Sequence, residues 1–202
     1  GEYYITDVIE IMLSEGEKVG AYVTDLEQTM GVNDKLQLSQ VGKILNRRKV
    51  EALMLAGVTI IDPDKVQVTT NVKVGRDTVL YPGTVLEGDS VIGENCVIGS
   101  NTSLNNCKVG NNTKILETVG IDSEIGSDTN VGPFAYLRPG TKVGSEVKIG
   151  DFVEVKNSTI DDGTKVAHLT YIGDADVGKR VNFGCGTVVV NYDGVNKHRT
   201  II

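Results

Sequence analysis

The chain has 202 residues, with 20 Lys and Arg against 27 Asp and Glu and a formal net charge of −7. An acidic chain lacks the basic surface that nucleic-acid binding requires, although a local cluster of cations can still hold a phosphate-bearing small molecule. No apolar run is long enough for a bilayer and no signal peptide is visible, so we expect no membrane insertion. Three widely spaced cysteines form no disulfide pattern and favour a cytoplasmic protein.

The first predicted elements are a helix and a strand. Apolar residues at helical spacing follow Thr6, which is a suitable N-cap, and Gly16 suits the helix end. Residues 19–23 are expected to form a strand. A second, longer helix is predicted over about residues 35–56, capped by Asn33 or Asp34.

A short strand is then expected at residues 58–61, before Asp62 and Pro63 break the chain. From Val68 onward a period of six replaces the helical period. Apart from slips of one or two residues, an apolar residue recurs every sixth position, at Val68, Val74, Leu80, Leu86, Ile92, Ile98, Leu104, Val109, Ile115, Ile121, Ile125, Val131, Leu137, Val143, Ile149, Val155, Ile160, Val166, Ile172, Val177, Phe183 and Val189.

A small or β-branched residue precedes each of these positions by two, as Val119 precedes Ile121, and glycine often follows. This is the hexapeptide pattern of a parallel β-helix, in which three hexads make one triangular coil of about 18 residues. Residues 68–190 therefore predict roughly seven coils. We expect the glycines to adopt the corner dihedrals, and Cys96 and Cys107 to pack in the small-residue positions.

The repeat is broken where cations follow the apolar residue, at Arg138 and Lys156. Their spacing of 18 residues predicts equivalent corners of successive coils, about 4.8 Å apart. Two stacked cations favour a bridging anion, and Arg with Lys suits phosphate, although both side chains can also simply point into solvent.

His168 is predicted to project outward one coil beyond the two cations, where a neutral imidazole can act as a general base. An exposed lone histidine more often has no role. The hexads stop at Asn191-Tyr192-Asp193-Gly194, so a loop carrying Lys197 is expected there, whether as a plain turn or as a functional segment.

Several strings closely resemble the bifunctional N-acetylglucosamine-1-phosphate uridyltransferase and glucosamine-1-phosphate acetyltransferase family. They lie at residues 134–140, 151–156, 168–174, 181–187 and 191–194, and upstream at residues 2–7 and 31–39. The resemblance implies a mainly β fold: a left-handed β-helix acetyltransferase domain over residues 66–202, truncated at its C-terminal end. Residues 1–60 then form the C-terminal remnant of a Rossmann-like nucleotidyltransferase domain, with the helix at 35–56 as linker.

The resemblance also implies roles for single residues. His168 is the general base that takes a proton from glucosamine 1-phosphate, whose 2-amino group attacks acetyl-CoA. Arg138, Lys156, Tyr171, Asn182 and Lys197 bind the sugar phosphate. The residues that contact acetyl-CoA are Cys185, Asn191 and Tyr192. Asn33 helps to hold Mg²⁺. The family forms homotrimers, and its other reaction uses UTP to make UDP-N-acetylglucosamine for the cell wall.

The chain departs from the family in three respects. Ala167 replaces the usual glycine before the base. The glycine-rich nucleotide loop and the Mg²⁺-binding Asp of the uridyltransferase domain are missing from this sequence, so we expect no uridylyl transfer. Both ends are expected to be cut, which makes acetyl transfer by the isolated chain doubtful.

Three other interpretations compete with this one. A β-helix carbonic anhydrase needs three histidines around a metal, and this chain has two. A serine or lipid A acyltransferase does not explain residues 1–60. A non-catalytic trimerising or regulatory module is permitted by the fold, but gives no reason for the alignment of Arg138, Lys156 and His168.

Overall fold

The computed structural model describes all residues except 1 and 3. The chain divides into two compact units, Gly1–Gly42 and Lys43–Ile202. This division falls within the long helix and therefore differs from the predicted boundary at residues 60–66. The last turns of the helix and the strand after it belong with the β-helix.

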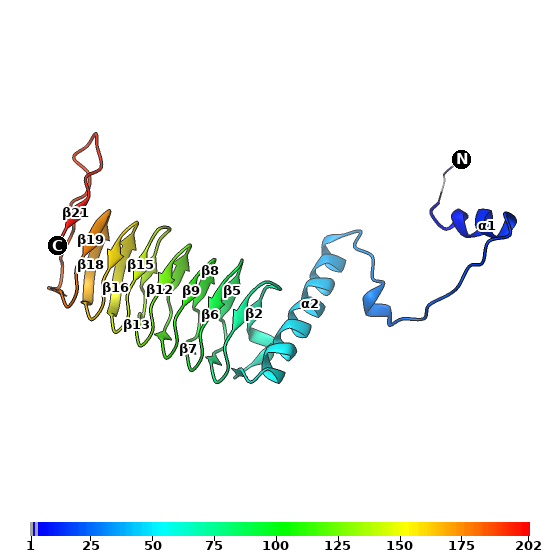
Figure 1. Cartoon of the computed structure of the whole chain (residues 1–202), viewed down its shortest axis with the longest axis horizontal. Coiled ribbons are helices and arrows are strands. Elements are labelled where there is room, and N and C mark those ends of the chain that lie inside the picture. The colour runs from blue at the N-terminus through cyan, green and yellow to red at the C-terminus, as the bar shows by residue number, and fades with distance from the viewer. Residues whose placement is uncertain (1, 3) are drawn as a thin grey trace. The chain divides into compact units, whose positions relative to one another are not determined.

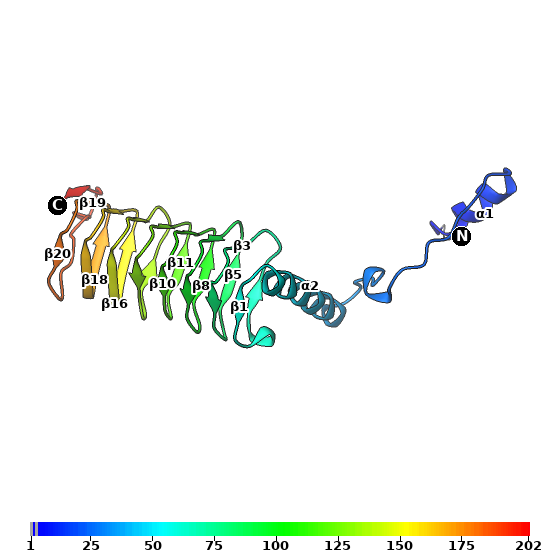
Figure 2. The same cartoon turned by 60° about the horizontal axis from the view of Figure 1, so that its bottom comes forward.

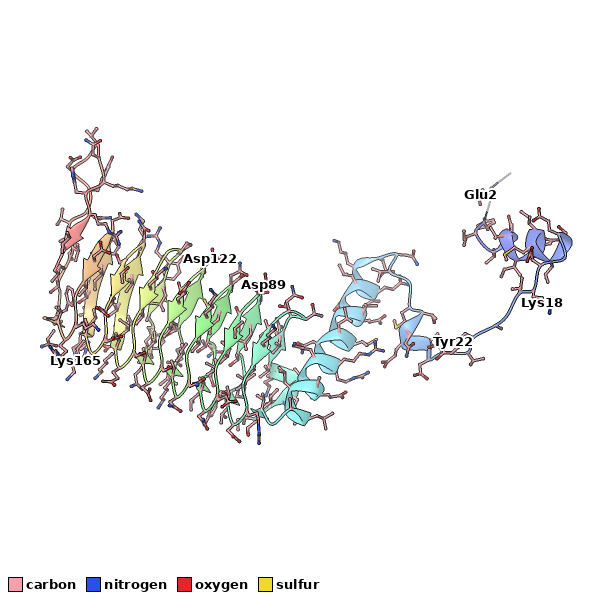
Figure 3. The ribbon with its side chains drawn as sticks, in the orientation of Figure 1. Glu2, Lys18, Tyr22, Asp89, Asp122 and Lys165 are labelled. Carbon is pink, nitrogen blue, oxygen red and sulfur yellow. The ribbon has the colours of Figure 1, made fainter. Side chains whose placement is uncertain are left out.

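The first unit contains helix α1 (Asp7–Ser14) and a short 3-10 helix, η1 (Leu26–Gln28). Thr6 occupies the N-cap position of α1 as predicted, but its side chain makes no capping hydrogen bond. The strand predicted at residues 19–23 is wrong: these residues are irregular and pair with no other described segment. Tyr22 and Val23 are 90% and 92% exposed, so nothing stabilises an extended strand there, and Tyr22 is drawn in Figure 3.

Helix α2 (Lys35–Leu55) confirms the second helical prediction. The backbone N–H of Gln37 donates to Asp34 Oδ1 at 2.7 Å, so Asp34 is the cap, and the Gln37 side chain accepts from the Asn33 N–H. Toward its C-terminal end, Val50 and Leu53 are buried. No helix in the described part of the chain is both long and apolar enough to cross a membrane.

The end of α2 covers the first coil of the β-helix. The side chain of Asn46 donates to the Val66 carbonyl at 2.8 Å and accepts from the Val68 N–H at 2.8 Å. The Lys49 ammonium donates to the Val72 carbonyl at 2.6 Å. These contacts satisfy backbone groups that the first coil would otherwise expose at its open end.

The strands of the second unit form three parallel faces, stacked coil on coil as Figures 1 and 2 show. The first face contains β1 (Thr59–Ile60), β4 (Val79–Leu80), β7 (Val97–Ile98), β10 (Lys114–Ile115), β13 (Asn130–Val131), the first parts of β16 (Lys148–Lys156) and β18 (Lys165–Gly173), and β20 (Asn182–Phe183). A short 3-10 helix, η2 (Pro63–Lys65), follows β1 at the predicted break.

The second face contains β2 (Gln67–Val68), β5 (Val85–Glu87), β8 (Ser103–Asn105), β11 (Val119–Ile121), β14 (Tyr136–Leu137) and the second parts of β16 and β18. The third face contains β3 (Lys73–Val74), β6 (Val91–Ile92), β9 (Lys108–Val109), β12 (Glu124–Ile125), β15 (Lys142–Val143), β17 (Thr159–Ile160), β19 (Ala175–Val177) and β21 (Thr200–Ile201). The predicted parallel β-helix is confirmed, while its left-handed sense stays a prediction.

The core is the column of inward side chains that the hexad pattern predicts, and nearly all of these residues are buried. Cys96 and Cys107 are fully buried within it, and burial raises the pKa of both thiols. Their predicted packing role is therefore confirmed. One hexad was placed wrongly: Thr118 and Gly120 are buried there, whereas Val119 is 42% exposed and Ile121 is only partly covered.

The error at Ile121 has a simple physical cause. Gly120 aligns with Leu104 below and Leu137 above, and a Cβ on Gly120 would lie 2.8 Å from the Leu104 side chain. The coil is shortened before this glycine, so the inward position shifts by one residue. The hexad pattern follows large apolar side chains. It therefore misses Gly120, an inward residue whose space is filled by the side chain of Leu104.

The glycines that follow the inward residue do not have the predicted role at the corners. Most of them have ordinary φ angles, and the positive φ usually falls on the residue before a buried small side chain, as at Asn95 (54°) and Asn112 (56°). Glycine is needed instead because the coils approach closely: a Cβ on Gly126 would lie 2.5 Å from the Gly144 backbone. Close stacking, and not a special dihedral angle, selects glycine here.

Candidate functional site

Arg138 and Lys156 lie at the same corner of successive coils, as their spacing predicts. Leu137 is the register partner of Val155, and the Arg138 N–H donates to the Val155 carbonyl at 2.8 Å. The next coil places Gly173 opposite Lys156. This corner lies where the second face ends and the chain turns toward the third.

Neither cation points freely into solvent. Arg138 Nη1 lies 2.8 Å from Glu154 Oε1, and its guanidinium lies 5.9 Å from the centre of the Tyr136 ring. Lys156 Nζ lies 3.0 Å from Asp174 Oδ2, and this hydrogen bond raises the pKa of the lysine. The protein itself therefore supplies a carboxylate to each cation, while the remaining N–H donors of each stay available to a ligand.

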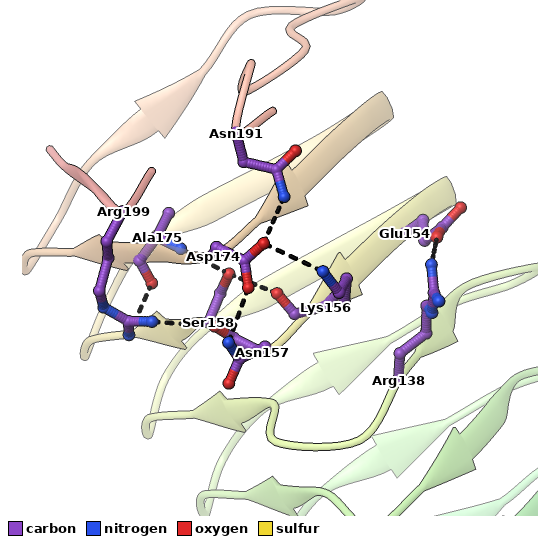
Figure 4. Close-up of polar contacts among 9 residues, drawn as sticks. All are labelled: Arg138, Glu154, Lys156, Asn157, Ser158, Asp174, Ala175, Asn191 and Arg199. Carbon is purple, nitrogen blue, oxygen red and sulfur yellow. Dashed lines mark hydrogen bonds and ion pairs between the residues drawn. The ribbon is translucent and has the colours of Figure 1, made fainter. Parts of the chain in front are cut away.

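Asp174 is the most enclosed carboxylate of this corner, and Figure 4 shows its contacts with Lys156, Asn157 and Asn191. Burial alone would raise its pKa, but hydrogen bonds from Asn157, Lys156 and Asn191 outweigh burial and lower the pKa to about 2. The Asn157 side chain donates to Asp174 at 2.7 Å, and Asn191 donates to the same carboxylate. Asp174 is therefore ionised throughout the neutral range and joins three segments.

The loop predicted after the last hexads is present, and hydrogen bonds order it internally. Asp193 accepts from the N–H groups of Asn196 and Val195 at 2.7 and 2.8 Å, and its second oxygen lies 2.7 Å from His198 Nε2. The Asn196 bond, followed by those of His198 and Val195, lowers the pKa of Asp193 to about 2. The Tyr192 hydroxyl donates to the Gly194 carbonyl.

The end of the loop returns to the β-helix through Arg199. Its guanidinium forms a two-pronged ion pair with Asp176 and also donates to the Asn157 carbonyl at 3.1 Å. Strand β21 then pairs with β19, so that Thr200 lies opposite Ala175. The loop carrying Lys197 is thus fixed at both ends, and Lys197 lies near enough to Lys156 to influence the pKa of that lysine.

His168 projects outward from β18, as predicted, and its side chain is 56% exposed. Its Nδ1 atom lies 2.9 Å from Asp151 Oδ1, and Asp151 is its register partner one coil earlier. This hydrogen bond lowers the pKa of Asp151. A carboxylate at Nδ1 selects the tautomer that leaves Nε2 as a free acceptor, which is the form that a general base requires.

His168 does not stack over the two cations, and this part of the prediction is wrong. It aligns with Asp151, at the start of the second face, whereas Lys156 aligns with Gly173 at the end of that face. Asp151 and Lys156 are five positions apart along the strand, which corresponds to at most about 16 Å of extended chain. Glu154 and Tyr171 face outward between these two positions. The Tyr171 hydroxyl lies close to Gly173, because a Cβ on Gly173 would lie 2.3 Å from it.

The outer surface of the second face is therefore the candidate site, with the imidazole at one end and the cations at the other. Cys185 is exposed and follows β20, which pairs with β18, so it lies one coil after His168 in the same corner. Asn191 is 9% exposed and its side chain is bound to Asp174. Asn182 lies opposite Lys165, on the first face and away from Lys156. Asn33 belongs to the other compact unit.

Three carboxylates of this site were missed by the sequence analysis: Asp151, Glu154 and Asp174. Each follows or precedes a predicted site residue by about one coil, since Asp151 is 17 positions before His168 and Asp174 is 18 positions after Lys156. Their signal in the sequence is a charge of opposite sign one coil away from a cation or a histidine, and not a stack of like charges.

Comparison with known proteins first gives the class. The bacterial transferase hexapeptide family (six repeats) matches residues 71–106 and 122–157. Together with the three-faced coil, this match defines the class as a hexapeptide-repeat protein whose repeats are similar to those of bacterial transferases.

The particular relatives follow from whole-chain similarity, since the chain is similar over its full length to the bifunctional GlmU proteins. It is 56% identical to GlmU of Clostridium perfringens and 54% identical to GlmU of Clostridium beijerinckii, in each case over all of this chain and 44% of the relative. The chain thus spans less than half the length of these relatives. A solved structure, the UDP-N-acetylglucosamine O-acyltransferase LpxA of Moraxella catarrhalis, is 17% identical, with a TM-score of 0.48 over 67% of this chain and 63% of that one.

Proposed function

We propose that this chain carries the acetyltransferase site of a bifunctional enzyme. The reaction transfers the acetyl group of acetyl-CoA to the 2-amino group of glucosamine 1-phosphate, and the product N-acetylglucosamine 1-phosphate is then converted with UTP to UDP-N-acetylglucosamine. The observation that carries the proposal is the pair of His168 with Asp151 on the same face as Arg138 and Lys156. The identity to GlmU over the whole chain supports it.

His168 is the proposed general base. With Asp151 accepting from Nδ1–H, the Nε2 lone pair takes a proton from the sugar amine as its nitrogen attacks the thioester carbonyl carbon. A C–N bond forms, the C–S bond breaks, and coenzyme A leaves as a thiolate that takes up a proton. Asp151 orients the imidazole and stabilises the imidazolium that forms, as a carboxylate does in a catalytic triad.

Arg138 and Lys156 are the proposed phosphate-binding residues. Each uses part of its donor capacity on a carboxylate, Glu154 or Asp174, which fixes its position and leaves further N–H donors. Tyr171 lies beside them on the same face, and Lys197 approaches from the loop. We assign Asn182 a sugar contact and Cys185, Asn191 and Tyr192 contacts with acetyl-CoA. These four assignments rest on the resemblance of their sequence strings.

A homotrimer is part of the proposal, and an exposed apolar column beside His168 supports it. Phe134 and Phe152 are 53% and 57% exposed, their rings stack with centroids 5.4 Å apart, and Leu169 continues the column. All three have positive φ, between 42° and 58°, which bulky residues rarely adopt. Exposed apolar side chains held on costly backbone conformations suit an interface between copies of this chain, next to the site.

A magnesium site does not fit the residues of this chain. Asn33 supplies one amide oxygen, and no group of three or more His, Cys, Asp or Glu in the described residues could hold a metal ion. Mg²⁺ demands octahedral oxygen ligands, of which one amide is a small part. We therefore derive no uridylyl step from these residues, and assign the ion only to the longer bifunctional enzyme, which we expect to be cytoplasmic.

Thermal denaturation with glucosamine 1-phosphate tests the proposal. A ligand that binds the folded chain stabilises it by an amount that grows with the logarithm of ligand concentration above the dissociation constant, whereas a module without this site does not respond. We expect the melting temperature to rise with glucosamine 1-phosphate and to rise less in a Lys156→Gln variant. No shift at any concentration would favour the module that only assembles.

A further inference from the structure

The corner between the second and third faces carries a ladder of Asn and Asp side chains. Asn71 donates to Asp89 at 3.0 Å, and Asn106 donates to Asp122 at 3.1 Å. Figure 3 shows Asp89 and Asp122 along one edge of the β-helix, while Lys165 lies on another side. The bond from Asn157 to Asp174 continues this ladder, so the simplest role of Asp174 is to stack one coil on the next.

Asp174 makes contacts that a ladder does not require. Asp122 is exposed and its carboxylate accepts from Asn106, whereas Asp174 is 6% exposed and accepts from Lys156 and Asn191 in addition to Asn157. A buried carboxylate is costly unless charge and hydrogen bonds compensate it. The additional donors provide that compensation, and they come from two segments that the proposed reaction uses.

Asp174 also holds both ends of the loop at residues 192–199. Asn191, immediately before the loop, donates to its carboxylate (Figure 4). The N–H of Thr200, immediately after the loop, donates to the Asp174 carbonyl at 3.0 Å. Lys197 lies between these two fixed ends. The same residue therefore sets the position of Lys156 and the base of the loop that carries Lys197.

We propose that Asp174 is a positioning residue that holds Lys156 and the 192–199 loop together, so that Lys156 and Lys197 face one phosphate group. The inference rests on the proposed function, whose sugar phosphate supplies that group. Two ammonium groups repel one another across a short distance, and a carboxylate beside them offsets the repulsion while the ligand is absent. Asp174 touches no reacting atom in this account.

Hydrogen exchange without ligand tests the coupling directly. Asp174→Asn is compared with Asp122→Asn, a matched control at the same corner, since both residues have positive φ (49° and 43°) and both accept from an Asn one coil earlier. We expect the amides of residues 192–199 to exchange at least about tenfold faster in Asp174→Asn. The closed loop loses a charged hydrogen bond in this variant, so its local opening costs less free energy. Equal exchange in the two variants would reduce Asp174 to a ladder residue and overturn the inference.

Affinity for glucosamine 1-phosphate provides the second readout, measured by calorimetry with glucosamine as the ligand that lacks phosphate. We expect Asp174→Asn to weaken glucosamine 1-phosphate binding by about tenfold, as loss of a charge-assisted hydrogen bond does, and to leave glucosamine binding unchanged. Asp122→Asn should alter neither. Equal weakening of both ligands would indicate general disorder of the site and contradict a positioning role.

A second variant covers the case in which Asp174→Asn does not fold. Asn191→Ala removes one tie of the loop while the pair of Lys156 with Asp174 remains. It should speed exchange in the loop and weaken phosphate binding less than Asp174→Asn does; unchanged exchange would overturn the inference. If the unmodified chain binds no glucosamine 1-phosphate, the proposed function fails, and the exchange experiment still decides the role of Asp174.

Discussion

The Nδ1 atom of His168 lies 2.9 Å from a carboxylate oxygen of Asp151, in the preceding coil of the β-helix. Stacking of parallel strands produces this contact, because residues 17 positions apart become lateral neighbours. The pair makes an exposed imidazole into a group of defined tautomer and orientation.

Replacing Asp151 by Asn should lower kcat for acetyl transfer by about tenfold to a thousandfold, with a smaller change in KM. The amide keeps the shape of the carboxylate but can favour the wrong imidazole tautomer and does not stabilise the imidazolium. Steady-state kinetics in an enzyme extended to the length of its relatives provides the measurement. Asp162→Asn, which breaks a similar pair with Lys179 elsewhere, is the control and should leave kcat unchanged. A KM effect alone would assign Asp151 to substrate binding.

Replacing Arg138 by Gln should weaken binding of glucosamine 1-phosphate by about tenfold or more, because a two-pronged charged donor to phosphate is lost. Calorimetric titration measures the dissociation constant. Lys108→Gln is the matched control, since Lys108 pairs with Glu124 on the third face. If the control weakens binding equally, the effect reflects net charge and not the corner of Arg138.

Replacing Phe152 by Asp should dissociate the proposed homotrimer into monomers. The substitution places a charge in the exposed apolar column, next to the stacked ring of Phe134, where a neighbouring copy would bury it without a partner. Sedimentation velocity distinguishes the two states. Val91→Asp, at an exposed apolar position on the third face, should leave assembly unchanged. A trimer that survives Phe152→Asp would place the interface elsewhere.

Replacing Gly126 by Ala should destabilise the β-helix by about 1–3 kcal/mol, because the added Cβ would lie 2.5 Å from the backbone of Gly144. Chemical unfolding measures the change. Gly184→Ala is a close control: Gly184 also follows an inward residue, but no atom lies within 4 Å of its added Cβ. Similar losses in both variants would mean that a dihedral preference, and not close stacking, selects glycine after the inward residue.

The repeat could be predicted from the sequence because each hexad buries one aliphatic side chain, and this requirement is local. The inward position of Gly120 was not predicted, because glycine has no apolar side chain and the space beside it is filled by Leu104 of the neighbouring coil. The outward position of His168 and the shared corner of Arg138 and Lys156 also followed from counting residues. The strand at residues 19–23 did not form, because propensity alone supplies no partner.

The relation of His168 to the cations required the register of the second face. The sequence places the three residues in successive coils, but which end of the face each occupies depends on where the chain turns, and positive φ at Phe152 and Leu169 marks that turn. The carboxylates Asp151, Glu154 and Asp174 carry a sequence signal only in their one-coil spacing from the site residues, and the structure shows the contacts that they make. Pairing between coils, and not local pattern, defines the electrostatics of the site.

Acetyl transfer by a His168→Ala variant tests the account most directly, in an enzyme extended to the length of its relatives so that uridylyl transfer can be measured in the same sample. The exposed imidazole leaves little packing to lose, so the fold should survive. We predict a loss of acetyl transfer of about a hundredfold or more with uridylyl transfer unchanged. Retention of acetyl transfer, or equal loss of both activities, would contradict the assignment of His168 as the general base.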